Sequence, residues 1–170
     1  MQLSFIVVTH QRGALLQACL DSILMQTDLP HPFEIILVDN GGNAKFNLAE
    51  NQGAFQVRHL RPAHNLNAVG GRNLGMQHAQ GTFWVLMDDD AAWHAPRDVA
   101  RLLALFADQP RCGAVATHSL HPRTGAVLPL DLPHPRKRWL QQQHRPLPVP
   151  YFYGVAHGLR AAAIQKRAST

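Results

Sequence analysis

Cysteine and long apolar runs are both scarce in this sequence. Cys19 and Cys112 are the only cysteines, and their separation does not match a cysteine metal site, so we expect both to be buried and reduced. No apolar run approaches the roughly 20 residues that cross a bilayer. The apolar segment at residues 3–8 is too short for a signal-peptide core and follows no basic residue. These absences argue against a membrane-spanning or disulfide-rich protein and predict a cytoplasmic one.

Lysine is scarce too, although the chain is basic. The formal net charge is +5 over 170 residues, and only Lys45, Lys137 and Lys166 among the 16 basic residues are lysines. Arginine suits phosphate because its planar guanidinium donates two hydrogen bonds at once. An arginine excess that serves solubility explains the charge equally well. With 46% hydrophobic and 16% charged residues, the composition indicates one globular domain and excludes disordered and fibrous chains.

Short apolar runs alternate with helical patterns along the first two thirds of the chain. Five runs predict strands, at residues 3–9, 33–39, 55–60, 82–88 and 112–118. Apolar positions spaced by three or four residues predict helices at 15–24 and 99–106. Strands buried on both faces and separated by helices indicate a mostly parallel sheet in an α/β fold. In such sheets the ligand lies beyond the carboxyl ends of the strands.

Polar residues stand where three of these strands end. Thr9 closes the first strand, Asp39 the second, and the triplet Asp88-Asp89-Asp90 follows the fourth. Thr9 and Asp39 taken singly fit ordinary strand ends and turns. The triplet is costly, because two carboxylates about 4 Å apart repel by roughly 4 kcal/mol at an effective dielectric of about 20. If the strand geometry continues, Asp88 and Asp90 point the same way and can share a hard divalent cation; an acidic loop in solvent is the alternative.

The segment at residues 65–81 combines glycine, arginine and asparagine. We predict a glycine turn at Gly70-Gly71, then Arg72 and Asn73, and then a helix. Glycine permits close approach of a ligand to the backbone, and the amides at a helix start beside Arg72 favour an anion. A plain junction between a loop and a helix explains the same residues.

The alternation of strand and helix patterns stops after the fifth predicted strand. We divide it into an α/β half at 1–117 and a second part at 118–170, within one domain overall. The second part predicts a hairpin that turns at residues 122–125, followed by a loop rich in proline, arginine and glutamine.

A basic cluster, Arg136-Lys137-Arg138-Trp139, lies within that loop. It suits peripheral contact with anionic lipid at the inner face of the membrane, or with a lipid-linked diphosphate acceptor. A solvated basic loop is the alternative. We expect no nucleic-acid partner.

Other classes that handle phosphate fit less well. Haloacid-dehalogenase-type phosphatases carry Asp-x-Asp on the first strand, where this chain has Thr9-His10, and a toprim domain needs a glutamate there. A dinucleotide-binding domain places G-x-G-x-x-G after that strand, and sugar-nucleotide pyrophosphorylases place a glycine-rich, arginine-lysine loop there. This chain has THQRGAL at that position instead.

Four stretches occur in the order and spacing found in family 2 glycosyltransferases: SFIVVTHQR, EIILVDNGG, N-x-N-x-V-G-G-R-N-x-G and VLMDDDA. The chain resembles that family over residues 2–114 and more loosely over 151–164. The MDDDA form most resembles members that use rhamnose or galactofuranose donors. The resemblance implies the GT-A fold of nucleotide-diphospho-sugar transferases, a Rossmann-like, mostly parallel sheet flanked by helices. It also implies metal-assisted, inverting transfer of a sugar from a nucleotide-diphospho-sugar to an acceptor hydroxyl on a saccharide or lipid-linked acceptor, in cell-wall or polysaccharide biosynthesis.

The resemblance assigns roles at the nucleotide. Thr9 and Asp39 would hold the nucleobase, with Asp39 accepting its imide N–H. Arg72 and Asn73 would lie along the nucleotide. The predicted nucleotide-sugar site in full is Thr9, Arg12, Asp39, Gly71, Arg72, Asn73, Asp88 and Asp89.

The resemblance also implies a metal site. Asp88 would face the ribose or the metal, and Asp90 would bind Mg²⁺ or Mn²⁺ on the diphosphate, so the predicted metal ligands are Asp88 and Asp90. The cation would neutralise charge on the leaving nucleoside diphosphate. A bound cation would offset the repulsion among the three carboxylates.

An acidic general base is missing from the place where the family has one. Inverting members use an aspartate, often in a Glu-Asp pair, downstream of the element that resembles residues 151–160. No aspartate follows Asp131 and no glutamate follows Glu50. His157 is the one substitute candidate, with core packing as its alternative. We therefore expect a donor half without most of the acceptor half, as in a fragment or a truncated gene, and a catalytically incomplete nucleotide-sugar-binding chain is the alternative function.

Overall fold

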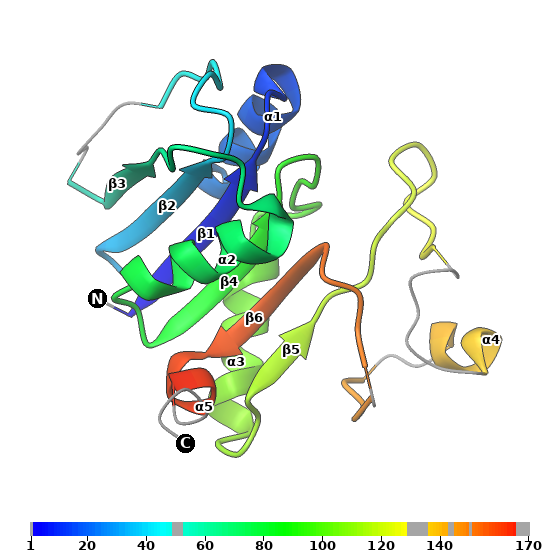
Figure 1. Ribbon diagram of the computed structural model, residues 1–170. Helices are drawn as coiled ribbons and strands as arrows, with labels where there is room; N and C mark the ends of the chain where they lie inside the picture. The colour runs from blue at the N-terminus through cyan, green and yellow to red at the C-terminus, as the bar shows by residue number, and fades with distance from the viewer. Residues whose placement is uncertain (1, 49–52, 129–135, 143–144, 150, 166–170) are drawn as a thin grey trace.

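The computed structural model describes residues 2–48, 53–128, 136–142, 145–149 and 151–165. They form a six-stranded sheet with helices on both faces (Figure 1). The elements follow in this order: β1 (Leu3–Thr9), α1 (Gly13–Leu24), β2 (Phe33–Asp39), β3 (Phe55–Leu60), α2 (Asn67–His78), β4 (Phe83–Asp88), α3 (Asp98–Asp108), β5 (Ala114–Ala116), α4 (Lys137–Gln141), β6 (Ala156–Arg160) and α5 (Ala161–Gln165).

The sheet has the strand order β3-β2-β1-β4-β6-β5. The first four strands of the chain run parallel, and β6 runs antiparallel to both of its neighbours, β4 and β5. The predicted mostly parallel α/β sheet is therefore confirmed. The first three predicted strands match β1, β2 and β3 to the residue, whereas the strand predicted at 112–118 is reduced to the short β5.

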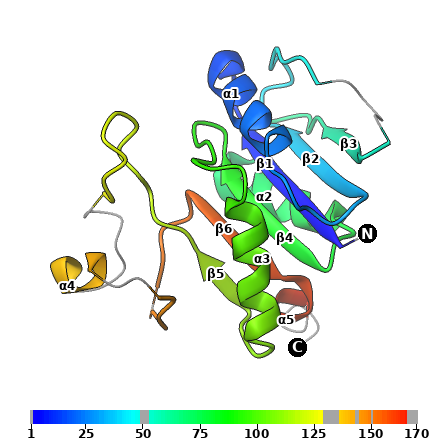
Figure 2. The ribbon, with the colours of Figure 1, turned by 180° about the vertical axis from the view of Figure 1, so that it is seen from behind.

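Each face of the sheet packs against its own set of helices. α2 covers the face turned to the viewer in Figure 1, and α1 and α3 cover the face seen in Figure 2. Because successive side chains of a strand point to opposite faces, β1 supplies Phe5 and Val7 to the α1 and α3 side and Ile6 to the α2 side. Full burial of one such side chain stabilises the fold by about 1.5–3 kcal/mol. β1 is thus the centre of both cores.

α2 lies close against β1 because glycines face the strand. A Cβ on Gly71 would stand 2.6 Å from Val8 Cγ1, and one on Gly75 would stand 2.4 Å from Ile6 Cγ2. The predicted glycine turn is wrong, since α2 begins at Asn67 and both Gly70 and Gly71 lie inside the helix. Tight packing on the sheet, rather than turn formation, accounts for these glycines.

The last described segment returns to the same sheet. β6 lies between β4 and β5, and Arg160 at its end donates to the carbonyl oxygens of Phe106 (2.8 Å) and Cys112 (3.0 Å). Its guanidinium also stands 5.1 Å from the centroid of the Phe83 ring. Arg160 therefore satisfies a carbonyl in the last turn of α3 and ties that helix to the sheet.

Three smaller expectations concern the hairpin, the cysteines and membrane spans. The predicted hairpin is present as a turn closed by an isolated bridge between Leu120 and Val127. Cys19 is buried as predicted, whereas Cys112 is only half-buried, and both are free thiols. Within the described ranges, no helix is both long enough and apolar enough to cross a membrane.

Candidate functional site

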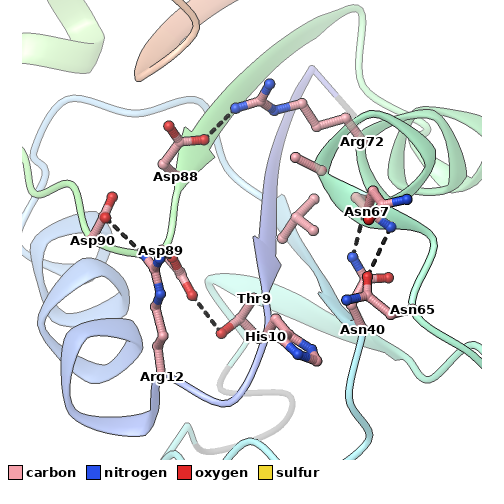
Figure 3. A pocket seen from close by; sticks show the side chains of 12 residues that line it. Thr9, His10, Arg12, Asn40, Asn65, Asn67, Arg72, Asp88, Asp89 and Asp90 are labelled. Carbon is pink, nitrogen blue, oxygen red and sulfur yellow. Dashed lines mark hydrogen bonds and ion pairs between the residues drawn. The ribbon is translucent and has the colours of Figure 1, made fainter.

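The carboxyl ends of β1, β2 and β4 meet at one edge of the sheet. In the strand register Thr9 lies beside Asp39 and Val8 lies beside Asp88, so the convergence predicted from the strand ends is confirmed. A cleft of about 440 Å³ lies at this edge (Figure 3). It is lined by Val8, Thr9, His10, Arg12, Asn40, Asn65, Asn67, Ala68, Arg72, Asp88, Asp89 and Asp90.

Two arginines engage the aspartate triplet. Arg72 reaches Asp88 from α2, and Arg12 approaches from the segment before α1 (Figure 3). Arg12 Nη1 lies 2.7 Å from Asp90 Oδ2 and 3.5 Å from Asp89 Oδ1. The expected continuation of the strand is wrong, because β4 ends at Asp88 and the next two aspartates form a turn. Strand alternation therefore does not set the directions of these carboxylates; the turn and the arginines do.

Asp89 fastens this turn to β1. Its side chain is buried, and its Oδ2 accepts a hydrogen bond from Thr9 Oγ1 at 2.7 Å. Thr9 is almost fully buried as well. A buried carboxylate that accepts a hydroxyl and faces a guanidinium is well satisfied. Asp89 therefore holds the β4 turn in place and leaves Asp88 and Asp90 as the more exposed carboxylates of the triplet.

The three aspartates affect the pKa values of groups around them. The pKa of the Asp88 carboxyl is raised above its usual value, first by burial and then by Asp90 and Asp89, although Arg72 opposes this rise. Behind the triplet, Cys19 Sγ lies 3.6 Å from the carbonyl oxygen of Asp88. Burial, followed by the charges of the three aspartates, raises the pKa of the Cys19 thiol to about 12. Burial and these carboxylates together keep the thiol protonated.

Asp39 holds the turn after β2. It is fully buried, and its carboxylate accepts hydrogen bonds from the backbone N–H groups of Gly42 at 3.0 Å and Ala44 at 3.1 Å. His59 Nε2 lies 3.5 Å from Asp39 Oδ2. Asp39 therefore stands beside Thr9 without lining the cleft, and the next residue, Asn40, lines it instead.

Three asparagines outside the predicted site line the other side of the cleft. Asn40 Nδ2 donates to the carbonyl oxygen of Asn67 at 3.1 Å, and Asn40 Oδ1 accepts from the N–H of Leu66 at 3.3 Å. Asn65 Oδ1 accepts from the N–H of Asn67 at 2.8 Å. The two bonds of Asn40 tie the β2 turn to the start of α2. The signal in the sequence was the N-x-N spacing before the helix, which is also ordinary capping chemistry.

Two predicted site residues on α2 lie away from the cleft lining. Gly71 packs against Val8 and Asn40, and Asn73 is exposed on the helix. Neither belongs to the lining residues, whereas Arg72 between them does. The helix geometry explains this, because neighbouring residues on an α-helix project in different directions.

His157 lies on β6 next to the Arg72 side of the cleft. It pairs with Leu86 of β4 and is only 7% exposed, and its Nδ1 has no hydrogen-bond partner among the described atoms. Burial, followed by the charge of Arg72, lowers the pKa of His157 to about 4, although a hydrogen bond with the Gly154 backbone opposes this. Arg72 Nη2 donates to Gly154 O at 3.2 Å. His157 is thus a neutral, buried imidazole that does not line the cleft.

Asp88 and Asp90 provide the ligand type that Mg²⁺ and Mn²⁺ prefer. Their side chains are 36% and 47% exposed, so both are accessible from the cleft. Over the part of the chain that the structure describes, no three histidine, cysteine, aspartate or glutamate side chains form a complete metal site. One or two carboxylates fit a cation that keeps bound waters and takes further oxygens from a phosphate ligand.

Comparison with known sequences identifies related proteins. Residues 4–167 match the family described as Glycosyl transferase family 2. The galactofuranosyltransferase GlfT1 of Mycobacterium tuberculosis (strain ATCC 25618 / H37Rv) is 39% identical over 104 residues, which cover 58% of this chain and 34% of the relative. GlfT1 of Mycolicibacterium smegmatis is 33% identical over 131 residues, which cover 75% of this chain and 40% of the relative. The matches thus cover well under half the length of these relatives.

Comparison with solved structures gives the same fold. The mannosyltransferase PcManGT from Pyrobaculum calidifontis, in complex with GDP-Man and Mn²⁺, matches with a TM-score of 0.70 at 20% identity, over 98% of this chain and 46% of that chain. S. aureus TarS 1-349 matches with a TM-score of 0.69 at 17% identity, over 99% of this chain and 49% of that one. The predicted GT-A fold is confirmed by these neighbours. Since the family match extends over almost the whole sequence, the chain belongs to glycosyl transferase family 2.

Proposed function

We propose that this chain forms the donor-binding half of a glycosyltransferase, with a nucleotide-diphospho-sugar in the cleft. The main support is that Arg12 and Arg72 form ion pairs with the aspartate triplet at the ends of β1 and β4. Carboxylates that can hold a cation, next to guanidinium groups that can hold phosphate, match a metal-bound diphosphate. The neighbours in complex with GDP-Man and Mn²⁺ and with UDP-GlcNAc support this class of donor.

Asp88 and Asp90 are the proposed ligands of Mg²⁺ or Mn²⁺. When bound, the cation would neutralise negative charge on the leaving nucleoside diphosphate. Arg72 and Arg12 occupy these carboxylates in the structure, so cation binding requires each arginine to give up part of its contact. The released guanidinium groups can then donate to the diphosphate oxygens. The arginines are therefore proposed to pair with these carboxylates in the structure described here and with the diphosphate of a bound donor.

The nucleobase end is proposed at Thr9 and the β2 turn. Asp39 acts there by fixing the turn, because its carboxylate already accepts backbone N–H groups. The side-chain amides of Asn40, Asn65 and Asn67 face the same cleft and can each donate or accept a hydrogen bond.

The proposed reaction transfers the sugar to an acceptor hydroxyl with inversion. The acceptor oxygen bonds to the anomeric carbon, the bond to the diphosphate breaks, and the hydroxyl proton passes to a base. Among the described residues from 136 to 165, His157 is the only histidine, aspartate or glutamate. Its pKa of about 4, set by burial and Arg72, makes it a weak base at neutral pH. This observation favours a second candidate function, nucleotide-sugar binding without transfer.

Calorimetry with UDP and with GDP, in Mn²⁺ and in chelator, tests donor binding. We expect one of the two nucleotides to bind more tightly in Mn²⁺ than in chelator. In Asp90→Asn the affinity for that nucleotide in Mn²⁺ should fall roughly 10–100-fold. Asp108→Asn, at an exposed position at the end of α3, is the control with the same change of charge. Equal affinity in metal and in chelator would contradict the proposed site.

Product analysis separates the two candidate functions. The chain is incubated with the nucleotide sugar of the preferred base and with saccharide acceptors, and products are identified by mass spectrometry. Turnover that Asp90→Asn abolishes establishes a transferase. Metal-dependent binding without turnover supports the binding function instead.

A further inference from the structure

Charge is divided unevenly along the chain. Residues 1–117 contain ten acidic and eight basic side chains, whereas residues 118–170 contain one acidic and eight basic ones. Asp131 is that single acidic residue, and no carboxylate side chain follows it. The net positive charge of the protein therefore comes from the second part of the sequence. A stretch of sequence with this excess of basic residues favours an anionic partner.

The second part includes a projecting segment that we call the α4 arm, comprising residues 136–142, 145–149 and 151–153. Both ribbon views show the arm beyond the β5 edge of the sheet, outside the layers formed by α1, α2 and α3 (Figures 1 and 2). Arg136 and Arg145 are exposed on it, and Lys137 is half-buried. No acidic residue lies within the arm. The arm is thus a projection that carries basic side chains and no acidic ones.

The same arm carries exposed aromatic side chains. Trp139 is 44% exposed, Tyr151 50% and Tyr153 47%, and the two tyrosine rings stand edge to face with centroids 6.2 Å apart. Among the described residues, these three are the large aromatic side chains with the highest exposure. Tryptophan and tyrosine favour the boundary between lipid headgroups and hydrocarbon, because each has an apolar ring with a polar group. Basic and aromatic side chains together provide two signals for one surface.

We propose that the α4 arm docks on the anionic headgroups of a lipid bilayer. The basic side chains supply electrostatic attraction, and Trp139 and the tyrosines lie at the headgroup level. A basic patch of this size gives weak, reversible binding that salt reduces, because exposed charges are screened within about 8–10 Å at ordinary ionic strength. Docking needs no nucleotide, so the proposal goes beyond the proposed donor site and can fail or hold independently of it.

Vesicle co-sedimentation of the whole chain tests the proposal. Vesicles of phosphatidylcholine alone are compared with vesicles that contain about a third phosphatidylglycerol, at low and at high salt. We expect binding to the anionic vesicles only, lost at high salt. Each basic side chain contributes about fivefold to partitioning, so R136Q/K137Q together should lower it roughly 25-fold.

The matched control, R97Q/R101Q, removes the same charge from exposed positions at the start of α3 and should bind as the unchanged protein does. Equal loss in both double variants would show that net charge, rather than the arm, drives binding. Equal binding to neutral and anionic vesicles, or no binding to either, would also overturn the proposal. Binding of a single-stranded oligonucleotide through the arm, with no vesicle binding, would replace lipid by nucleic acid.

The fluorescence of Trp139 provides a second readout, which does not depend on the net charge of the protein. Trp84 is buried and Trp93 half-buried, so Trp139 is the most exposed of the three tryptophans. We expect anionic vesicles to shift tryptophan emission to shorter wavelength and brominated lipid to quench it. In W139F both signals should disappear while sedimentation persists. Unchanged emission in the unsubstituted protein bound to vesicles would place Trp139 away from the lipid and refute the docking geometry.

Discussion

The two arginine–aspartate pairs of the cleft differ in how far solvent reaches them. The side chains of Arg72 and Asp88 are 25% and 36% exposed, whereas those of Arg12 and Asp90 are 52% and 47% exposed. Arg72 also donates to Gly154 O, so it connects α2, β4 and the segment before β6. An exposed ion pair contributes about 0–1 kcal/mol, while breaking a partly desolvated pair leaves a carboxylate without its partner. The Arg72 side should therefore govern stability, and the Arg12 side should yield more readily to a ligand.

The largest expected effect comes from displacing α2, which carries Arg72. In Gly71→Ala the new Cβ would meet Val8 at 2.6 Å, so the helix or the strand must shift. Overpacking of this kind costs about 1–3 kcal/mol of the free energy of unfolding, measured by urea denaturation. Gln77→Ala, at an exposed position on the same helix, is the control and should change little. Wild-type stability in Gly71→Ala would show that α2 is not held by close packing on β1.

The next largest effect concerns pH. The pKa of His157 is lowered from 6.5 to about 4 by burial and by Arg72, so between these values the folded chain binds fewer protons than the unfolded one. The stability that neutral His157 contributes is thus fully present above pH 6.5 and is lost as pH falls toward 4. At a pH of about 5 the loss is about 2 kcal/mol.

His157→Gln should remove that part of the pH dependence when unfolding is measured at several pH values. His94→Gln, which replaces an exposed histidine, controls for the change of residue type. If the free energy of unfolding of His157→Gln still falls with pH as it does in the unchanged protein, protonation of buried His157 beside Arg72 is not what destabilises the fold at low pH.

Arg72→Gln addresses the half-buried pair directly. Removal of the guanidinium leaves Asp88 and Gly154 O without this donor, and we expect a loss of about 1–2 kcal/mol after allowance for solvent. Chemical denaturation of Arg72→Gln and of the double variant Arg72→Gln/Asp88→Asn measures the coupling. If the double variant is no more stable than Arg72→Gln alone, the unpaired carboxylate is not the source of the loss.

The smallest effect is expected at Arg12. Arg12→Gln should change the free energy of unfolding by no more than about 0.5 kcal/mol, because the pair with Asp90 is open to solvent. Its effect should appear in nucleotide affinity measured by calorimetry instead. A loss as large as that of Arg72→Gln would remove the distinction between the two sides of the cleft.

The arrangement of the site along β1, β2 and β4 could be predicted because it follows from local patterns. Apolar runs set the strands, parallel pairing places their carboxyl ends at one edge, and Thr9, Asp39 and Asp88 then meet there. The exact positions of individual site residues could not be predicted in the same way. Glycine favours turns, so the sequence pattern places the start of α2 too late, whereas the contact with Val8 shows that Gly71 is needed for close packing inside the helix.

Long-range packing decided the other differences. Asp39 is an exception, because its carboxylate accepts hydrogen bonds from its own local turn, which is the alternative interpretation of the sequence, and Asn40 lines the cleft instead. His157 could be named from the sequence but not placed, since its burial depends on β6 pairing with a strand far earlier in the chain. The partners of Asp89 and Asp90 depend in turn on the exact residue at which β4 ends.

The position of β6 has a consequence for synthesis on the ribosome. β5 (Ala114–Ala116) emerges well before β6 (Ala156–Arg160), yet within the described sheet β6 is its neighbour and also covers the edge of β4. A nascent chain that has not yet released β6 exposes unpaired backbone groups along β4, and such open edges invite association with other chains. The β4 edge is therefore open from the time it leaves the ribosome until β6 has emerged and paired with it.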